Sequence, residues 1–106
     1  MAAGSPARHE VPAIDAAAMT AARWADRLVR AAREREAARW VAFLEPIPDR
    51  LRDEDLPGLR ATARRARAAY GAKDSIRDAL PGELTEPFRD AIDILLREIA
   101  RHELRR

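Results

Sequence analysis

Residues 85–106 read TEPFRDAIDILLREIARHELRR, and this stretch predicts the clearest helix of the chain. Its large apolar residues recur with 4-3-4 spacing, and at about 100° per residue they form one narrow stripe of Phe88, Ile92, Leu95 and Ile99. Such a stripe is the seam along which one helix packs against another. Thr85 is the predicted N-cap of this helix, because its hydroxyl can accept an N–H of the first turn. We therefore expect this helix to anchor a helical core.

One apolar residue of the same stretch, Ile94, falls on the opposite face, near Asp90 and Arg101. Two interpretations stay open. Single exposed apolar residues are common on protein surfaces. Alternatively, Ile94 contacts a partner.

The length and composition predict a single all-α domain. The chain has 106 residues, and 24 of its 50 apolar residues are alanine. Alanine and arginine favour helix, and no segment alternates apolar and polar residues as a strand does. We predict a small helical bundle of three main helices plus one short helix, with a long N-terminal helix. We expect residues 1–13 to be a disordered leader and residues 14–106 to be the domain.

Composition also excludes several classes of protein. The chain has no cysteine, which excludes disulfides and thiolate metal sites. It has no apolar run of about 18 residues and no apolar secretory signal, so we expect a cytoplasmic protein. The net charge of +2 is near balance and does not itself point to nucleic acid. Nineteen arginines against one lysine, with so much alanine, indicate GC-rich codons and a bacterial source.

The first helix is predicted over residues 15–44, between an Asp15 cap and the break imposed by Pro46. Its apolar stripe changes direction by roughly 140° between the first half, which contains Trp24, and the second half, which contains Trp40, Val41 and Leu44. Either the helix breaks near residues 33–36, so that both halves face one core, or it is continuous and its halves bury different faces.

We favour the continuous helix, because residues 33–36 read RERE and contain neither glycine nor proline. About 30 helical residues span roughly 45 Å, whereas a domain of this size has a radius of gyration of about 13 Å. A helix of this length extends beyond its own domain, so the apolar residues of the extending part need a second copy to pack against. We therefore predict a homodimer. The expected interface residues are Trp24, Trp40, Val41, Leu44 and Ile94.

The remaining elements follow from their caps. Residues 46–58 form a connection in which Ile47 and Leu51 point inward. A helix is predicted over residues 56–70 with Asp55 as its cap. A short helix is predicted over residues 74–80, where Ser75 and Asp78 resemble a capping box.

A basic ridge is the second candidate site. Arg60, Arg64 and Arg67 lie within about 60° on one helix, with Arg65 and Lys73 nearby. Such a ridge can follow nucleic-acid phosphates. It can equally be a solvated face, or pair with the acidic residues between 49 and 55. Aromatic residues for base stacking are missing from the ridge itself.

We predict neither enzymatic activity nor a cofactor. Glu98 and His102 have a spacing that suits two metal ligands, but the chain has only two histidines, so we predict no metal site. No phosphate-binding loop, activated nucleophile or inward carboxylate pair is recognisable. The expected function is that of a non-enzymatic protein–protein interaction or accessory protein that binds itself or an unidentified protein. The alternative is a small nucleic-acid-binding or regulatory protein that uses the arginine ridge.

Overall fold

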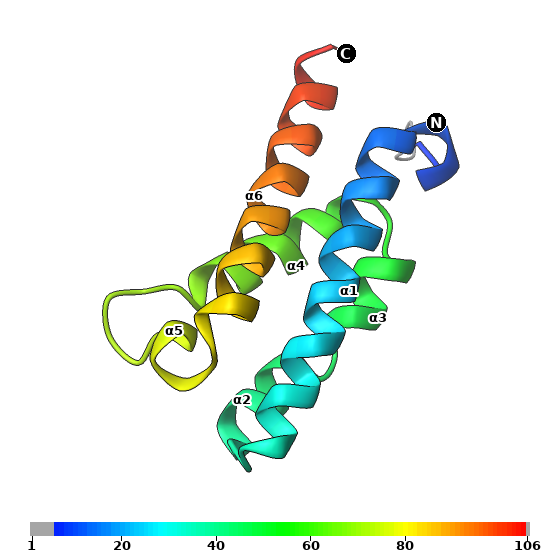
Figure 1. Cartoon of the computed structure of the whole chain (residues 1–106). Coiled ribbons are helices and arrows are strands. Elements are labelled where there is room, and N and C mark those ends of the chain that lie inside the picture. The colour runs from blue at the N-terminus through cyan, green and yellow to red at the C-terminus, as the bar shows by residue number, and fades with distance from the viewer. Residues whose placement is uncertain (1–5, 106) are drawn as a thin grey trace.

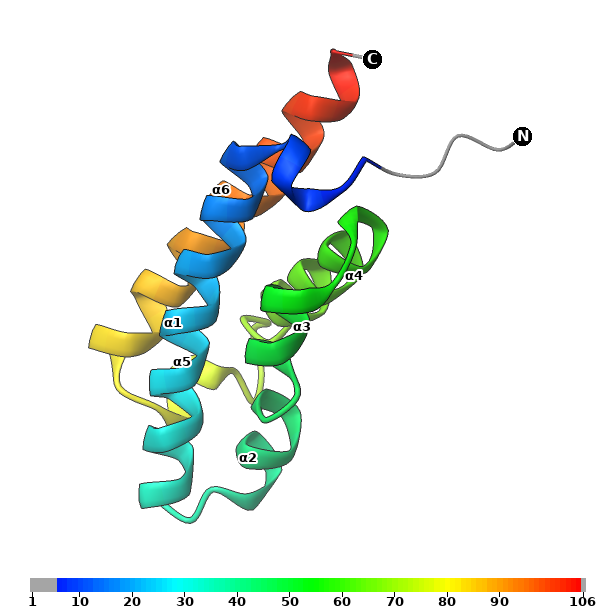
Figure 2. The same cartoon turned by 90° about the vertical axis from the view of Figure 1, so that its right-hand side faces the viewer.

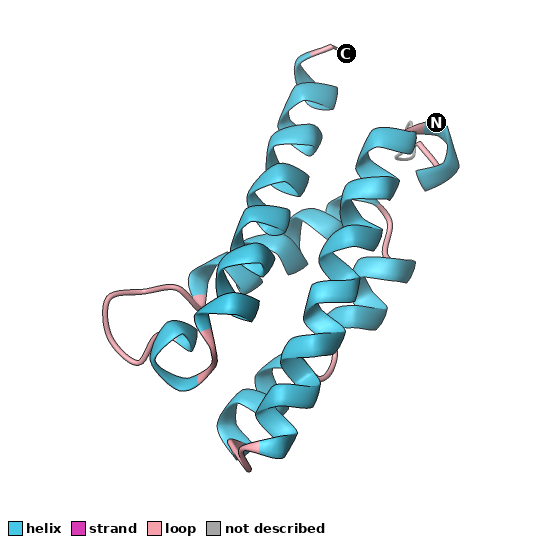
Figure 3. Ribbon diagram, in the orientation of Figure 1, coloured by secondary structure: helices cyan, strands magenta, loops and turns pink. Residues whose placement is uncertain are grey.

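The computed structural model describes residues 6–105, and every regular element in that range is a helix (Figures 1 and 3). A short 3-10 helix, η1, precedes six α-helices: η1 (Arg8–Glu10), α1 (Pro12–Glu34), α2 (Ala38–Leu44), α3 (Ile47–Asp53), α4 (Leu56–Ala68), α5 (Ile76–Ala79) and α6 (Gly82–Leu104). The all-α prediction is confirmed. The expected three main helices correspond to α1, α4 and α6, but shorter helices separate them. None of the described helices has the length and apolar content of a membrane span.

The helices form two layers (Figure 2). The two longest helices, α1 and α6, pack against each other and run in opposite directions, so the described ends of the chain lie at the same end of the bundle (Figure 1). The second layer contains α2, α3 and α4, of which α3 packs mainly on α1 and α4 on α6. The bundle is elongated, with extents of 47 × 22 × 21 Å.

The core lies between these layers. The predicted stripe of α6 is confirmed, since Phe88, Ile92, Leu95 and Ile99 are all buried. On α1 the wholly buried positions are mostly alanines, namely Ala18, Ala21, Ala22, Ala25 and Ala32. Small side chains let helix backbones approach closely, so an alanine-rich chain with few large apolar residues can still close its core.

The continuous first helix expected over residues 15–44 is wrong, and the alternative of a break near residues 33–36 is confirmed. The N–H of Glu36 donates to the carbonyl of Arg33 (3.1 Å), and that of Ala37 to the carbonyl of Ala32 (2.9 Å). Glu36 itself has φ 53°, in the left-handed region. Together these features form a Schellman motif, which usually uses glycine where this chain has Glu36.

Burial explains why the chain turns without glycine. A left-handed conformation costs a non-glycine residue roughly 1–2 kcal/mol. The turn brings Trp40, which is 8% exposed, and Leu44, which is 0% exposed, into the same core as α1. Burying a large apolar side chain contributes about 1.5–3 kcal/mol, so the two together outweigh the strain. The overhang that favoured a homodimer is therefore absent.

The expected start of the C-terminal helix is also wrong. Thr85 does not cap α6, because the helix begins at Gly82 with Pro81 as its N-cap. The N–H of Thr85 donates to the carbonyl of Pro81 (2.9 Å), and the Thr85 side chain is wholly buried. Pro87 then lies inside the helix and removes a bond to the carbonyl of Glu83. Glu83 is exposed, so solvent can satisfy that carbonyl.

Of the other predicted boundaries and caps, some are confirmed and some are wrong. Of the leader expected over residues 1–13, residues 1–5 lie outside the described residues, and the remainder contains η1 and the start of α1. Asp15 is not a cap, since α1 begins at Pro12, and its carboxylate instead pairs with Arg8 (2.9 Å). The Asp55 cap is confirmed by its bond from the Gly58 N–H (3.0 Å), and the capping box of Ser75 with Asp78 is confirmed as well.

Candidate interaction surfaces around α2

Helix α2 has three faces that do different things. Its core face carries Trp40 and Leu44, which are buried. Its outer face carries Ala38, Val41 and Ala42, at the i, i+3 and i+4 positions of one helical surface. Its third face carries residues that meet the end of α4. The turn at residues 35–37 sets these three faces, because it lays α2 back against the core and leaves its outer face uncovered.

The outer hollow, as we name it, lies on the outer face of α2. It has a volume of about 500 Å³ and is lined by Arg33, Glu36, Ala38, Val41, Ala42 and Glu45. Its floor is apolar and its rim is charged. One rim pair joins Arg33 Nη2 to Glu45 Oε2 at 3.0 Å, and both side chains are 59% exposed.

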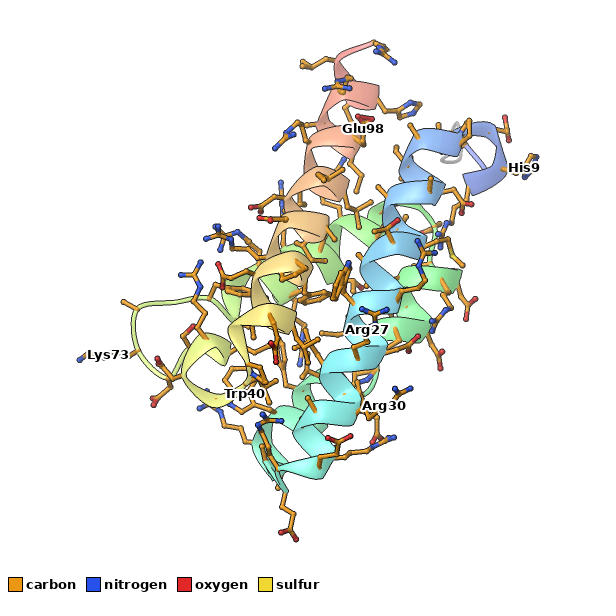
Figure 4. The ribbon with its side chains drawn as sticks, viewed as in Figure 1. His9, Arg27, Arg30, Trp40, Lys73 and Glu98 are labelled. Carbon is orange, nitrogen blue, oxygen red and sulfur yellow. The ribbon has the colours of Figure 1, made fainter. Side chains whose placement is uncertain are left out.

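The basic pocket, as we name the second hollow, lies between α2, the end of α4 and the loop that follows α4. Its volume is about 360 Å³, and its lining residues are Arg39, Trp40, Phe43, Arg65, Ala68, Ala69, Gly71, Lys73 and Asp74. Figure 4 shows Lys73 projecting outward from that loop, away from Trp40, which lies toward the bundle.

Two arginines of the basic pocket are stacked on aromatic rings. The Cζ atom of Arg39 lies 4.9 Å from the centre of the Trp40 ring, and that of Arg65 lies 5.5 Å from the centre of the Phe43 ring. The two rings meet edge to face, with centroids 5.7 Å apart. Aromatic stacking holds a guanidinium in place while its N–H groups stay available at the edge.

The five predicted interface residues do not form one surface. Trp40 and Leu44 belong to the chain's own core, because the turn at Glu36 brings them there. Trp24 is half-buried on α1 under the guanidinium of Arg27, whose Cζ atom lies 4.7 Å from the ring centre. Val41 lines the outer hollow. Ile94 is 48% exposed on α6.

The arginine ridge is divided as well. Arg60 pairs with Glu103, and Arg67 pairs with Asp93 (2.9 Å), so both guanidiniums join α4 to α6. Their partners are therefore on α6 rather than in the acidic connection over residues 49–55. Arg64 is exposed on the same face of α4 as Arg60 and Arg67, and Arg65 is exposed on another face. Of the ridge, only Arg65 and Lys73 line the basic pocket.

The shifted pKa values belong to helix junctions rather than to these hollows. Burial raises the pKa of Tyr70 well above its usual range, and the Tyr70 hydroxyl donates to the carbonyl of Thr85. The hydrogen bonds from Arg77 (2.9 and 3.1 Å) lower the pKa of Glu86. Bonding to Asp26 raises the pKa of Arg52. Each shift comes from a contact that joins helices of the bundle, or from burial between them.

Sequence reasoning missed Arg39 and Phe43. Their i, i+4 spacing puts them on one helical face, but nothing local brings Arg65 to that face. The shared outer face of Ala38, Val41 and Ala42 was not predicted either, because the helix was expected to continue through residue 36.

Within residues 6–105, no three His, Asp or Glu side chains gather closely enough to hold a metal ion. Glu98 and His102 instead line a hollow with the start of α1. Comparisons with protein-family models, with curated proteins and with solved structures found no match. The function is therefore argued from the geometry of the two hollows.

Proposed function

We propose that this chain is a non-enzymatic helical interaction protein that binds a second copy of itself through the outer hollow. The observation that carries the proposal is the apolar floor made by the exposed Ala38 and Ala42 and the half-buried Val41, beside a rim that contains both signs of charge. The opposite side of α2 packs in the core through Trp40 and Leu44, which holds the floor of the outer hollow in place.

A second copy fits this rim because the rim is self-complementary. In a two-fold dimer each surface meets its own duplicate. Arg33 of one copy can then pair with Glu45 of the other in place of the Glu45 of its own chain. Exchange of one exposed ion pair for another costs little, because such pairs contribute only about 0–1 kcal/mol.

The dimer is expected to be weak. Stable interfaces bury about 1,200–2,000 Å² in total, and three small apolar residues supply only a fraction of that area. Association should therefore depend on concentration over the micromolar to millimolar range. We propose that it takes place in the cytoplasm, in line with the cysteine-free composition.

The non-enzymatic part of the proposal draws support from the titratable groups. The side chains with shifted pKa values, such as Tyr70 and Glu86, contact neighbouring helices and do not line either hollow around α2. In enzymes, shifted pKa values tend to gather in the cleft where chemistry takes place.

Sedimentation equilibrium over a concentration series tests the proposal. We expect the average mass of the natural chain to rise with concentration, and Val41→Glu to remain monomeric, because a buried unpaired carboxylate is costly at an apolar contact. Ile94→Glu is the matched control, since it adds the same charge at an exposed apolar residue on another helix. Circular dichroism verifies that both variants fold.

Two results would overturn the proposal. One is a natural chain that stays monomeric up to millimolar concentration. The other is a Val41→Glu variant that associates as strongly as Ile94→Glu does.

A further inference from the structure

The basic pocket takes its cationic donors from more than the one helix on which the arginine ridge was predicted. Arg39 comes from α2 and Arg65 from α4, so two separate helices contribute one guanidinium each, whereas Lys73 of the loop after α4 projects outward (Figure 4). No ion pair engages any of these three side chains within residues 6–105, whereas Arg60 and Arg67 of the same ridge are paired. The pocket therefore keeps its positive charge.

The two guanidiniums are held before any ligand arrives. Arg39 lies over Trp40 and Arg65 over Phe43, at 4.9 and 5.5 Å from the ring centres. Since the two rings contact each other, the guanidiniums are tied to one aromatic cluster. A planar guanidinium offers in-plane donors that match the oxygens of a phosphate. Less side-chain freedom is then lost on binding.

The pocket also has features that a bare anion does not need. Its wall is formed by small residues, Ala68, Ala69 and Gly71, which leave a volume of about 360 Å³. That volume lies within the range of roughly 300–1,000 Å³ found for small-molecule sites. Arginine planes are surfaces on which unpaired bases stack. Asp74 adds one acceptor at the rim, where a base amino group or a sugar hydroxyl can donate.

We propose that the basic pocket binds one nucleotide, either free or as a unit of single-stranded nucleic acid. Arg39 and Arg65 hold the phosphate, and Asp74 accepts from the base or the sugar. This site lies on a different face of α2 from the outer hollow, so it does not depend on self-association.

The test uses the full chain and a fluorescein-labelled oligothymidylate, with fluorescence anisotropy at low salt as the readout. Unlabelled thymidine monophosphate, oligothymidylate and inorganic phosphate serve as competitors. The test variant carries Arg39→Gln and Arg65→Gln. The matched control carries Arg23→Gln and Arg97→Gln, which removes the same charge from exposed positions on α1 and α6. Thermal unfolding shows whether each variant is folded.

We expect the Arg39/Arg65 variant to lose about tenfold or more in affinity, because the loss of even one charged hydrogen bond costs about tenfold, and the control to lose far less. Competition by the mononucleotide supports the proposal and identifies a free nucleotide as sufficient. Competition by the oligonucleotide alone also supports it and assigns single-stranded nucleic acid.

Three outcomes overturn the proposal. The natural chain fails to bind the oligonucleotide at low salt. The two double variants lose affinity equally, as expected for general attraction by positive charge. Inorganic phosphate competes as well as the mononucleotide, which shows a simple anion site.

Discussion

The backbone of a single residue, Glu36, decides how the first fifty residues fold. Its φ of 53° ends α1 and turns the chain into α2. Glycine is the usual residue at this position of a Schellman motif, since it has no Cβ to clash. The glutamate is tolerated because the burial of Trp40 and Leu44 depends on the turn.

Replacement of Glu36 by glycine should therefore stabilise the protein or leave its stability unchanged. Relief of the left-handed strain contributes about 1–2 kcal/mol, and the greater freedom of glycine in the unfolded chain offsets roughly 0.5–1 kcal/mol of it. The free energy of unfolding in urea measures the difference. Glu34→Gly is the control, because Glu34 is an exposed helical residue two positions earlier. That change should destabilise by about 0.5–1 kcal/mol. Equal losses in both variants would argue against a turn at Glu36.

Arginine stacking is a second feature at this scale. Trp24, Trp40, Phe43 and Tyr70 each have at least one guanidinium over the ring. Contacts of this kind occur about once per 70–80 residues in proteins generally. In this chain arginine therefore covers the aromatic residues as well as providing charge.

At the scale of elements, α2 depends on its core face. Leu44→Ala should cost about 2–5 kcal/mol of unfolding free energy, because Leu44 is 0% exposed and its removal leaves a cavity. Urea unfolding measures this loss, and sedimentation of the folded variant should show unchanged association. A variant that keeps its stability but loses association would instead place Leu44 in an interface. Ala42→Ser, on the exposed face of α2, is a control that should change stability little.

Local features of the elements could be predicted from the sequence. The 4-3-4 stripe from Phe88 to Ile99 and the Asp55 and Ser75 caps depend on residues within a few positions of one another. The break at Glu36 could not be predicted in the same way, because no residue there disfavours a helix. Its cause is the burial of residues from both sides of the turn in one core.

For the candidate sites too, the sequence predicts what depends on neighbouring residues and not what depends on long-range packing. The ridge was visible because Arg60, Arg64 and Arg67 share one helix. The separation of the ridge into paired and unpaired arginines could not be predicted. The partners Glu103 and Asp93 come from α6, more than twenty residues later. The basic pocket combines α2 with the end of α4, so only the folded chain shows that Arg39 and Arg65 line one pocket.

At the scale of the molecule, ion pairs join neighbouring helices across the bundle. Arg52 with Asp26 joins α3 to α1, Arg67 with Asp93 joins α4 to α6, and Arg33 with Glu45 lies beside the turn. Exposed pairs of this kind contribute little individually. The stability of the bundle therefore comes mainly from the apolar core.

The turn between α1 and α2 creates both hollows, and cross-linking in solution shows whether the chain makes this turn. The chain has no cysteine, so Arg33→Cys with Glu45→Cys gives two unique thiols. In the folded bundle the natural side chains are 3.0 Å apart, whereas in a continuous helix twelve residues would separate them by about 18 Å. Arg23→Cys with Arg35→Cys is the control with the same spacing.

At low concentration, a bismaleimide much shorter than 18 Å should link residues 33 and 45 within one chain, as intact mass and peptide mapping can show. It should leave the pair at 23 and 35 unlinked. If neither pair forms an intramolecular link, or both link equally, the chain does not turn back at Glu36, and the account of both hollows fails.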